Sequence, residues 1–308
     1  MYVFKACLAA LLLVGHVVPV AADRAQTLAA VRAAIADPDN EETFKKYLAL
    51  LPKVQNPLAK GIAFYLVEGD MPMTEKRVRD YLQSKSSAPV GAGQDNPELL
   101  VNVEGGKPTY WEKPEQRTLK YAVMRASFRD QAKYDMVVQD MAAASGEWVN
   151  TCADCGLKFV HTPQFDKVDD PLTYVAHLQS DDIRFVVIFS DVTGADPANS
   201  YIARAFFPGG PAHLQSIILD STYFNQVGRP FTRVGVLRHE LGHVLGYRHE
   251  HIRDEAGCWL EGGEWKPLTP YDGKSVMHYP CGAAAARGDL VLSDLDKVGH
   301  RKQYALPK

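Results

Sequence analysis

Charge of one sign, internal repeats and long apolar runs are all scarce in this chain of 308 residues. Its formal net charge is only −3, which argues against nucleic acid or an acidic membrane surface as the main partner, because both require a basic surface. The chain shows neither an internal repeat nor a low-complexity tract. The length and a hydrophobic content of 46% predict one or two globular domains with a sizeable core.

The only apolar run of any length lies at the N-terminus, from Ala6 to Val20, and it follows the basic residue Lys5. Small residues then precede Asp23. This order is typical of an export signal, whereas a transmembrane anchor usually needs a run of about 20 residues. We therefore expect residues 1–22 to be a signal peptide and the protein to be secreted or periplasmic.

Cysteine is scarce as well, and removal of the signal peptide takes Cys7 away. Four cysteines remain, at Cys152, Cys155, Cys258 and Cys281. An even number in an exported chain predicts disulfide bonds. Three pairings are possible, of which we favour Cys258–Cys281 with Cys152–Cys155 as a local pair. A redox or zinc-binding role for the C-x-x-C pair is disfavoured because no second C-x-x-C is present.

The most informative segment, HELGHVLGYRH, begins at His239. On a helix, His239 and His243 share one face and can bind the same Zn²⁺ ion. Gly246 permits a left-handed turn that returns His249 as a third ligand, and a fourth position stays open for water, as in catalytic zinc sites. Glu240, rotated about 100° from His239 on a helix, suits a general base acting on that water.

An amphipathic helix with surface histidines is the alternative interpretation. Its apolar face would consist of residues at helical spacing on the side away from the histidines, namely Val234, Leu237, Leu241, Val244 and Leu245. The glycine and the third histidine in register favour the zinc site instead.

A second motif, S-V-M-H-Y, follows at 275–279. The extended zinc motif with a downstream methionine turn (Met-turn) resembles the metzincin metalloproteases. Three segments are similar to the astacin type: H-E-H-x-R at 249–253, Tyr271-Asp272, and L-S-x-L-D at 292–296.

One segment, A-R-A-F-F-P-G at 203–209, is instead similar to the matrixins. In matrixins a histidine of this segment binds a second, structural zinc, and Arg204 stands in its place here. The resemblance covers residues 115–308. It implies an α+β fold of the metzincin-type zincin class, with a mixed twisted sheet, an active-site helix, a loop-rich lower half and one catalytic Zn²⁺ ion.

The resemblance further implies a zinc-dependent endopeptidase in which Glu240 takes the proton of a zinc-activated water and passes it to the leaving amine. Tyr279 is similar to the astacin tyrosine that stabilises the oxyanion, although a core tyrosine is the alternative. Met277 packs beneath the metal. Glu250 is similar to the glutamate that seats the mature N-terminus in astacins, or else it forms a surface ion pair.

Two other functions use the same site. One is a zinc hydrolase acting on a non-protein amide or a cell-wall peptide. The other is a catalytically inactive zinc-containing binding module, which the intact Glu240 disfavours. The remaining histidines show no spacing that indicates a second metal site: His161, His177, His213, His251 and His278.

The chain divides into a helical, prosegment-like region at 23–110 and a catalytic domain at 111–308. Apolar residues repeat at helical spacing at 28–35, 44–51 and 78–82, with Thr74 as a cap for the third helix. A small, polar linker is expected at 85–97.

Within the catalytic domain we expect strands at 119–124, 156–162, 184–190, 201–207 and 216–220, a helix through 134–148 and a last helix at 294–304. A polypeptide substrate would pair with the 201–207 strand as an extra strand.

The stretch V-E-G-D-M at 67–71 resembles the F-x-G-D of astacin prosegments, with Val67 in place of the phenylalanine. In that family the aspartate ligates the zinc and displaces the catalytic water, so the resemblance implies a zymogen in which Asp70 blocks the metal. Cleavage within 85–118 would then activate the precursor. The alternative is ordinary turn chemistry ahead of the next helix.

Overall fold

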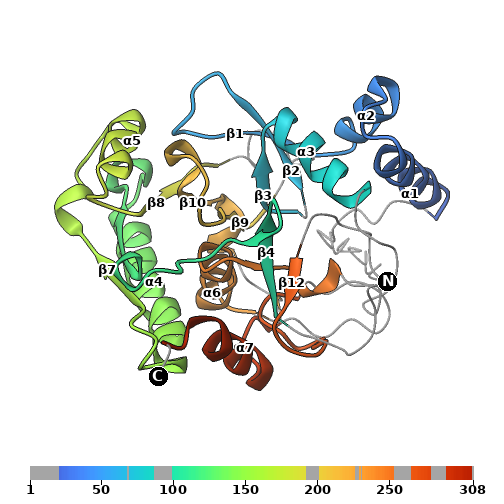
Figure 1. Cartoon of the computed structure of the whole chain (residues 1–308). Coiled ribbons are helices and arrows are strands. Elements are labelled where there is room, and N and C mark those ends of the chain that lie inside the picture. Colours follow the sequence, from blue (N-terminus) through green and yellow to red (C-terminus); the bar gives the residue numbers. More distant parts are fainter. Residues whose placement is uncertain are drawn as a thin grey trace, which may run out of the picture.

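The computed structural model describes residues 21–67, 69–86, 99–191, 201–225, 229, 231–252, 265–278 and 289–306 (Figure 1). The expected signal peptide falls almost wholly outside these residues. Within them, no helix is both long and apolar enough to span a membrane. Helices and strands occur in both halves of the chain, as expected for an α+β protein.

The N-terminal region, which we define as residues 21–86, contains α1 (Ala21–Ala36), α2 (Glu41–Leu48), β1 (Lys53–Gln55), β2 (Ala63–Val67), β3 (Met71–Met73) and α3 (Glu75–Ser86). The rest of the described chain contains β4 (Leu100–Glu104), β5 (Lys107–Pro108), β6 (Thr118–Val123), α4 (Gln131–Thr151), β7 (Lys158–His161), α5 (Pro171–Gln179), β8 (Phe185–Phe189), β9 (Ala203–Arg204), β10 (Ser216–Leu219), α6 (Arg233–Val244), β11 (Tyr247–Arg248), β12 (Trp265–Pro267) and α7 (Asp294–Tyr304).

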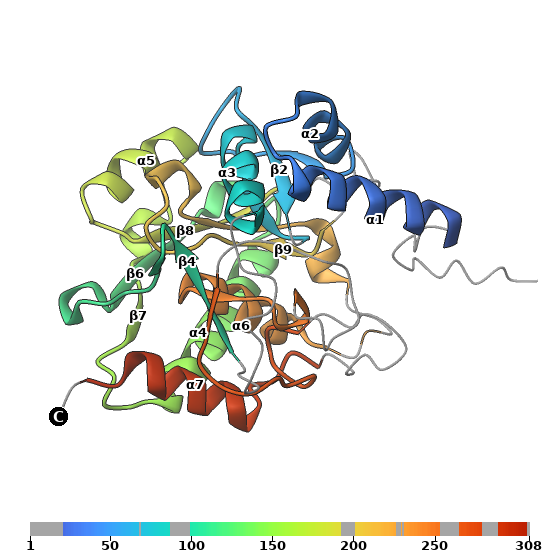
Figure 2. The same ribbon diagram turned by 45° about the vertical axis from the view of Figure 1, so that its right-hand side comes forward.

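A five-stranded sheet in the order β7-β6-β8-β10-β9 organises the larger part of the molecule. Its first four strands run parallel and β9 runs antiparallel to β10. Side chains alternate across such a sheet. On one face Val187 and Ile217 join the core around α4 and α6, whereas Val186 and Ile218 point to the opposite face and a second core. Figure 2 shows α4 and α6 together beneath the sheet.

The strands and helices predicted for the catalytic domain are confirmed to within a few residues, and α7 matches its predicted bounds. The edge strand is the exception, because 201–207 was expected and β9 covers only Ala203 and Arg204. Ala203 lies opposite Leu219, the last residue of β10. The Ile202 carbonyl still accepts from Asp220 N at 3.0 Å, so the backbone pairing continues by one hydrogen bond beyond the strand.

The N-terminal region is not wholly helical, and the prediction was wrong between α2 and α3. The three segments with helical spacing do form α1, α2 and α3, and the Thr74 hydroxyl caps α3 by accepting from Arg77 N at 3.4 Å. Between them, β1, β2 and β3 form an antiparallel sheet. Its strand A-F-Y-L-V is rich in aromatic and branched residues, which suit a pleated surface better than a helix.

Residues 100–108 pair with the C-terminal part of the chain. β4 lies antiparallel to β11, which lies within the H-E-x-x-H-x-x-G-x-x-H motif, and to β12. The predicted domain boundary after residue 110 remains a prediction, but this strand packs with the zinc-motif half of the molecule.

The local disulfide Cys152–Cys155 is present, as predicted. It closes the turn after α4, where Arg117 donates to the Cys155 carbonyl at 2.7 Å. The favoured partner pair, Cys258 and Cys281, lies outside the described residues.

Candidate metal centre

Helix α6 carries the first two histidines of the motif into the interior. Its N-terminus is capped by the Thr232 hydroxyl, which accepts from Gly235 N at 3.0 Å. One side of the helix packs against α4, where the Trp148 indole donates to the Arg238 carbonyl at 2.9 Å. His239 and His243 are 2% and 0% exposed, so both rings lie in a desolvated site.

Gly246 ends α6 in the way the motif predicts. Its φ is +95°, a left-handed conformation that strains residues with a side chain. A Cβ at this position would also overlap the Thr109 carbonyl. The turn leads into β11, which pairs with β4, and His249 follows directly, fully buried.

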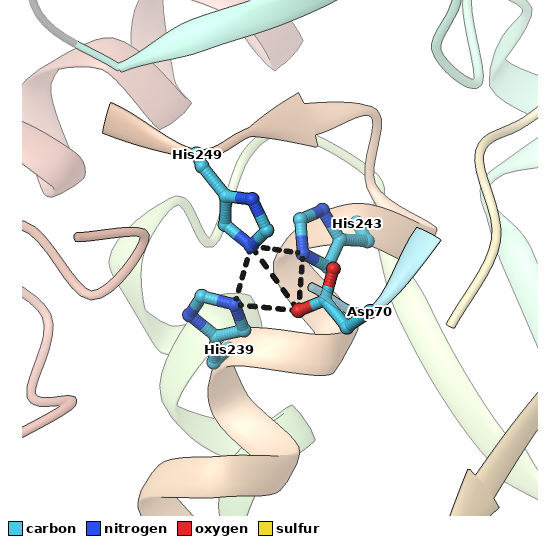
Figure 3. Close-up of side chains that lie close together, drawn as sticks. All are labelled: Asp70, His239, His243 and His249. Atoms are coloured by element: carbon cyan, nitrogen blue, oxygen red, sulfur yellow. Dashed lines mark hydrogen bonds and ion pairs between the residues drawn. The ribbon is translucent and has the colours of Figure 1, made fainter. Parts of the chain in front are cut away.

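The three Nε2 atoms of His239, His243 and His249 converge on one point together with a carboxylate oxygen of Asp70 (Figure 3). Nε2 of His249 is 3.1 Å from Nε2 of each of the other two histidines. Asp70 Oδ2 is 3.1, 3.4 and 3.5 Å from Nε2 of His249, His239 and His243. A tetrahedral zinc ion with bonds of roughly 2.0–2.1 Å holds its ligand atoms about 3.3–3.4 Å apart.

Hydrogen bonds at the far side of two rings fix their orientation. His239 Nδ1 donates to the Val276 carbonyl at 2.7 Å and His243 Nδ1 donates to the Tyr247 carbonyl at 2.8 Å. A carbonyl only accepts, so the ring proton sits on Nδ1 and the Nε2 lone pair faces the centre. Burial lowers the pKa of His239 to about 4 and also lowers that of His243. Several lone pairs facing one another at this distance fit a bound cation.

Asp70 enters this site from the N-terminal region. It lies in the tight turn between β2 and β3, next to Gly69, whose φ is +93°. Its side chain is 1% exposed. Burial acts to raise the pKa of Asp70, but the neighbouring histidines outweigh it and hold that pKa well below its usual value. Asp70 thus lies in a turn, as one interpretation expects, and beside the three histidines, while its role as a metal ligand remains a prediction.

Glu240 lies beside the histidines and is 2% exposed. Its Oε2 has no hydrogen-bond partner among the described residues. Burial, followed by the charge of Asp70, raises the pKa of Glu240 well above its usual value.

The Met-turn packs directly beneath α6. Met277 is fully buried, and Gly242 provides the space for its sulfur, since a Cβ at 242 would overlap that atom. Asp296 at the start of α7 holds the same turn through Ser275 Oγ at 2.6 Å and Val276 N at 2.7 Å. These contacts were not predicted, because the L-S-x-L-D segment marks Asp296 but does not indicate which residues its carboxylate contacts.

Replacing Gly242 with alanine is expected to lower the free energy of unfolding by about 1–3 kcal/mol, the usual cost of overpacking a core. It should also weaken metal binding, because Met277 and the adjoining Val276 carbonyl would have to move. Thermal denaturation and a metal titration measure both effects. Gly146→Ala on α4 is the matched control, since a Cβ there meets nothing within 4 Å and alanine should stabilise that helix. Equal stability of the two variants would contradict this packing.

The other residues predicted for the site include two that the structure does not describe and two that are buried. Tyr279 and Arg253 lie outside the described residues. Glu250 is 0% exposed, so the surface ion pair is wrong. Its backbone nitrogen donates to the Met277 carbonyl at 2.9 Å. Arg204 is buried on β9, and its guanidinium donates to the Gln55 carbonyl.

Three of the remaining histidines make ordinary polar contacts. His161 and His177 contact Asp166 and Asp182 at 2.8 and 3.0 Å. His278 Nε2 lies 2.8 Å from the Tyr271 hydroxyl. The other group with metal-ligand atoms among the described residues consists of the disulfide cysteines 152 and 155 with Asp154.

Comparison with known proteins yields distant, partial likenesses. No family model matches the chain. A stretch of 72 residues is 35% identical to the dorsal-ventral patterning protein tolloid of Drosophila melanogaster, over 17% of this chain and 7% of that one. The chain thus spans only a small fraction of that relative.

Among solved structures, the chain is similar to myroilysin. The likeness has a TM-score of 0.40 and 14% identity, and it covers 65% of this chain and 97% of that one. A similarity of this size does not show what the chain does.

Proposed function

We propose that this chain is an exported zinc-dependent endopeptidase, made as a latent precursor. The observation that carries the proposal is the convergence of three buried histidine Nε2 atoms and Asp70 Oδ2 at the spacing of a tetrahedral zinc site. When bound, zinc acts as a Lewis acid and lowers the pKa of a coordinated water. The partial match with tolloid points to the same class, a metallopeptidase.

Glu240 is the general base in this proposal. Its side chain comes from the same turn of α6 as His239, and its Oε2 is free to accept a proton. After loss of the N-terminal region, Asp70 no longer raises the pKa of Glu240 and water reaches the carboxyl group. Glu240 then takes a proton from the attacking water and delivers it to the leaving amine.

The substrate is an extended polypeptide lying beside the edge strand β9. Phe206 packs into the core, whereas the Phe207 ring is partly exposed and lies 5.6 Å from the His243 ring, edge to face. Successive side chains on an extended segment point in opposite directions. The backbone of this segment thus passes the metal centre, where an added strand would present its peptide bond.

Metal analysis and a protein digest test this proposal. Activated protein should hold one zinc ion, lose hydrolysis of casein and of a fluorogenic peptide on chelation, and recover both when zinc is added. Cleavage of small amides or cell-wall peptides alone would favour the other hydrolase, and zinc without any hydrolysis would favour an inactive binding module. Two tightly held zinc ions would contradict the assignment of Arg204 as a replacement for a metal ligand.

Tyr279 is proposed to stabilise the oxyanion of the transition state. Tyr279→Phe should then lower kcat more than it changes KM, because the hydroxyl acts mainly in the transition state. Steady-state kinetics on the activated protein measure the two separately. Tyr271→Phe, which removes a hydroxyl that contacts His278, is the control and should leave kcat within a few-fold of the parent. Normal kcat in Tyr279→Phe would remove the residue from the mechanism.

We further propose that residues 23–110 act as a prosegment in which Asp70 occupies the fourth ligand position. A carboxylate oxygen is a good zinc ligand, and the turn after Gly69 lets the backbone approach the site closely. This arrangement would exclude the catalytic water until the region is released.

A further inference from the structure

A second contact between the N-terminal region and the catalytic domain involves neither Asp70 nor the three histidines. One buried hydrophobic cluster contains side chains from both parts. The N-terminal region contributes Val54, Leu58, Ala59, Phe64 and Leu66, and the catalytic domain contributes residues that include Val186, Ile188, Tyr201, Leu214 and Ile218. Each of these ten side chains is less than 9% exposed.

The catalytic-domain side of this cluster is the outer face of the five-stranded sheet. Val186 and Ile188 on β8 and Ile218 on β10 point away from α4 and α6, as their alternation with Val187 and Ile217 shows. Helix α5 covers part of this face through Tyr174 and Leu178. Figures 1 and 2 both show the loop between β1 and β2 lying next to α5 and the short helix at Ala212–Leu214.

Polar contacts also fix the loop between β1 and β2 against the catalytic domain. Asn56 is 2% exposed, and its amide donates to the His213 carbonyl at 3.0 Å while its oxygen accepts from Leu58 N at 2.9 Å. The Arg204 guanidinium donates to the Gln55 carbonyl. The Phe64 and His213 rings lie 6.4 Å apart. The loop is thus bound by several buried contacts that do not involve the metal.

We propose that this outer sheet face is a binding surface for the N-terminal region, so that one cut between residues 86 and 99 leaves a non-covalent complex that stays latent. Release of the N-terminal region would expose apolar side chains on the outer face of the sheet to water, which is unfavourable. The turn that carries Asp70 and the loop that packs on the outer face belong to the same N-terminal fragment. Binding at one of these two contacts therefore raises the effective concentration of the fragment at the other. The latency rests on the proposed function, whereas the binding surface does not.

A site-specific cut in the full-length protein tests this. A recognition sequence for a selective protease replaces part of 87–98, and the nicked protein is examined by gel filtration at micromolar concentration and by peptide hydrolysis. We expect the two fragments to co-elute, with hydrolysis staying near the uncut level until mild denaturant or further digestion removes the N-terminal fragment. Separation of the fragments on cutting, with full activity, would overturn the proposal.

Four variants test whether the contact lies at this surface. Leu58→Asp should make the nicked fragments separate, and Leu58→Ala, a milder change, should make them separate at lower urea. Ile62→Asp is the matched control, since Ile62 lies in the same segment and is 41% exposed, and its fragments should co-elute. Asp70→Ala should also co-elute. Unchanged association in both Leu58 variants, or separation in Asp70→Ala alone, would contradict the proposed surface.

Co-elution is measured without any enzyme assay, which separates this inference from the proposed function. If the fragments co-elute but the isolated C-terminal fragment refolded with zinc never hydrolyses peptides, the endopeptidase proposal fails and the binding surface stands. If cutting gives full hydrolysis and the two fragments separate, the proposed binding surface is wrong and the endopeptidase proposal is supported.

Discussion

Replacing Glu240 with glutamine in the activated protein is expected to lower kcat by about 10²–10⁴-fold, the usual contribution of a general acid–base residue. Glutamine keeps the shape of the side chain but cannot carry the proton from water to the leaving amine. The three histidines are unchanged, so zinc content should stay at one ion for each chain. Steady-state kinetics and metal analysis of the same preparation measure both quantities.

Two control variants are compared with Glu240→Gln. Glu147→Gln changes a carboxylate on α4 that pairs with Arg238 of α6, and it should leave kcat within a few-fold of the parent. His239→Ala should lose zinc and hydrolysis together. Near-normal turnover in Glu240→Gln with zinc in place would show that another group transfers the proton.

The zinc motif illustrates how much of a site the sequence can encode. His239 and His243 share a helix face because of their spacing, and Gly246 needs its left-handed turn to return His249. These are local constraints, and each appears in the structure. The core residues of α6 and the capped last helix α7 follow from local patterns in the same way.

The contacts that orient the histidine rings could not be predicted from any pattern. The Val276 and Tyr247 carbonyls accept from His239 and His243, yet every residue carries a carbonyl. Which one reaches the ring depends on how the Met-turn and β11 pack against α6. Asp296 belongs to the L-S-x-L-D segment noted in the sequence, but that segment does not indicate its contact with the Met-turn, which lies before a helix that begins 17 residues after Met277.

The N-terminal region shows why helical spacing alone misled the prediction there. Short strands such as β1 and β3 have three residues each, too few to establish a periodicity of two. Their neighbours in sequence do repeat at helical spacing, and the interpretation was extended across them. The hairpin matters because its turn is what carries Asp70 to the metal centre.

Asp70→Asn in the uncut precursor is expected to raise basal peptide hydrolysis by roughly ten- to a hundredfold, since losing a charged contact typically costs about 1.5–3 kcal/mol. Asparagine keeps the size of the side chain but removes the charge that makes a carboxylate a good ligand. Hydrolysis should remain below that of the released domain, because the outer-face contact still holds the N-terminal region beside the three histidines. Asp70→Ala should behave similarly, and the separated fragment carrying either change should inhibit more weakly in trans.

Cobalt substitution provides a readout of Asp70 that does not depend on catalysis. Co²⁺ absorbs visible light according to its ligands, so the uncut parent and Asp70→Asn should differ in spectrum, and Asp70→Asn should resemble the released domain. Asp80→Asn is the control, because Asp80 lies on α3 of the same region in an exposed pair with Lys76 and should change neither spectrum nor activity. Full hydrolysis by an uncut precursor with Asp70 intact would show that the carboxylate does not block the site. The N-terminal region would then serve folding or remain as a permanent accessory part, and the close approach of Asp70 to His249 would have no inhibitory role.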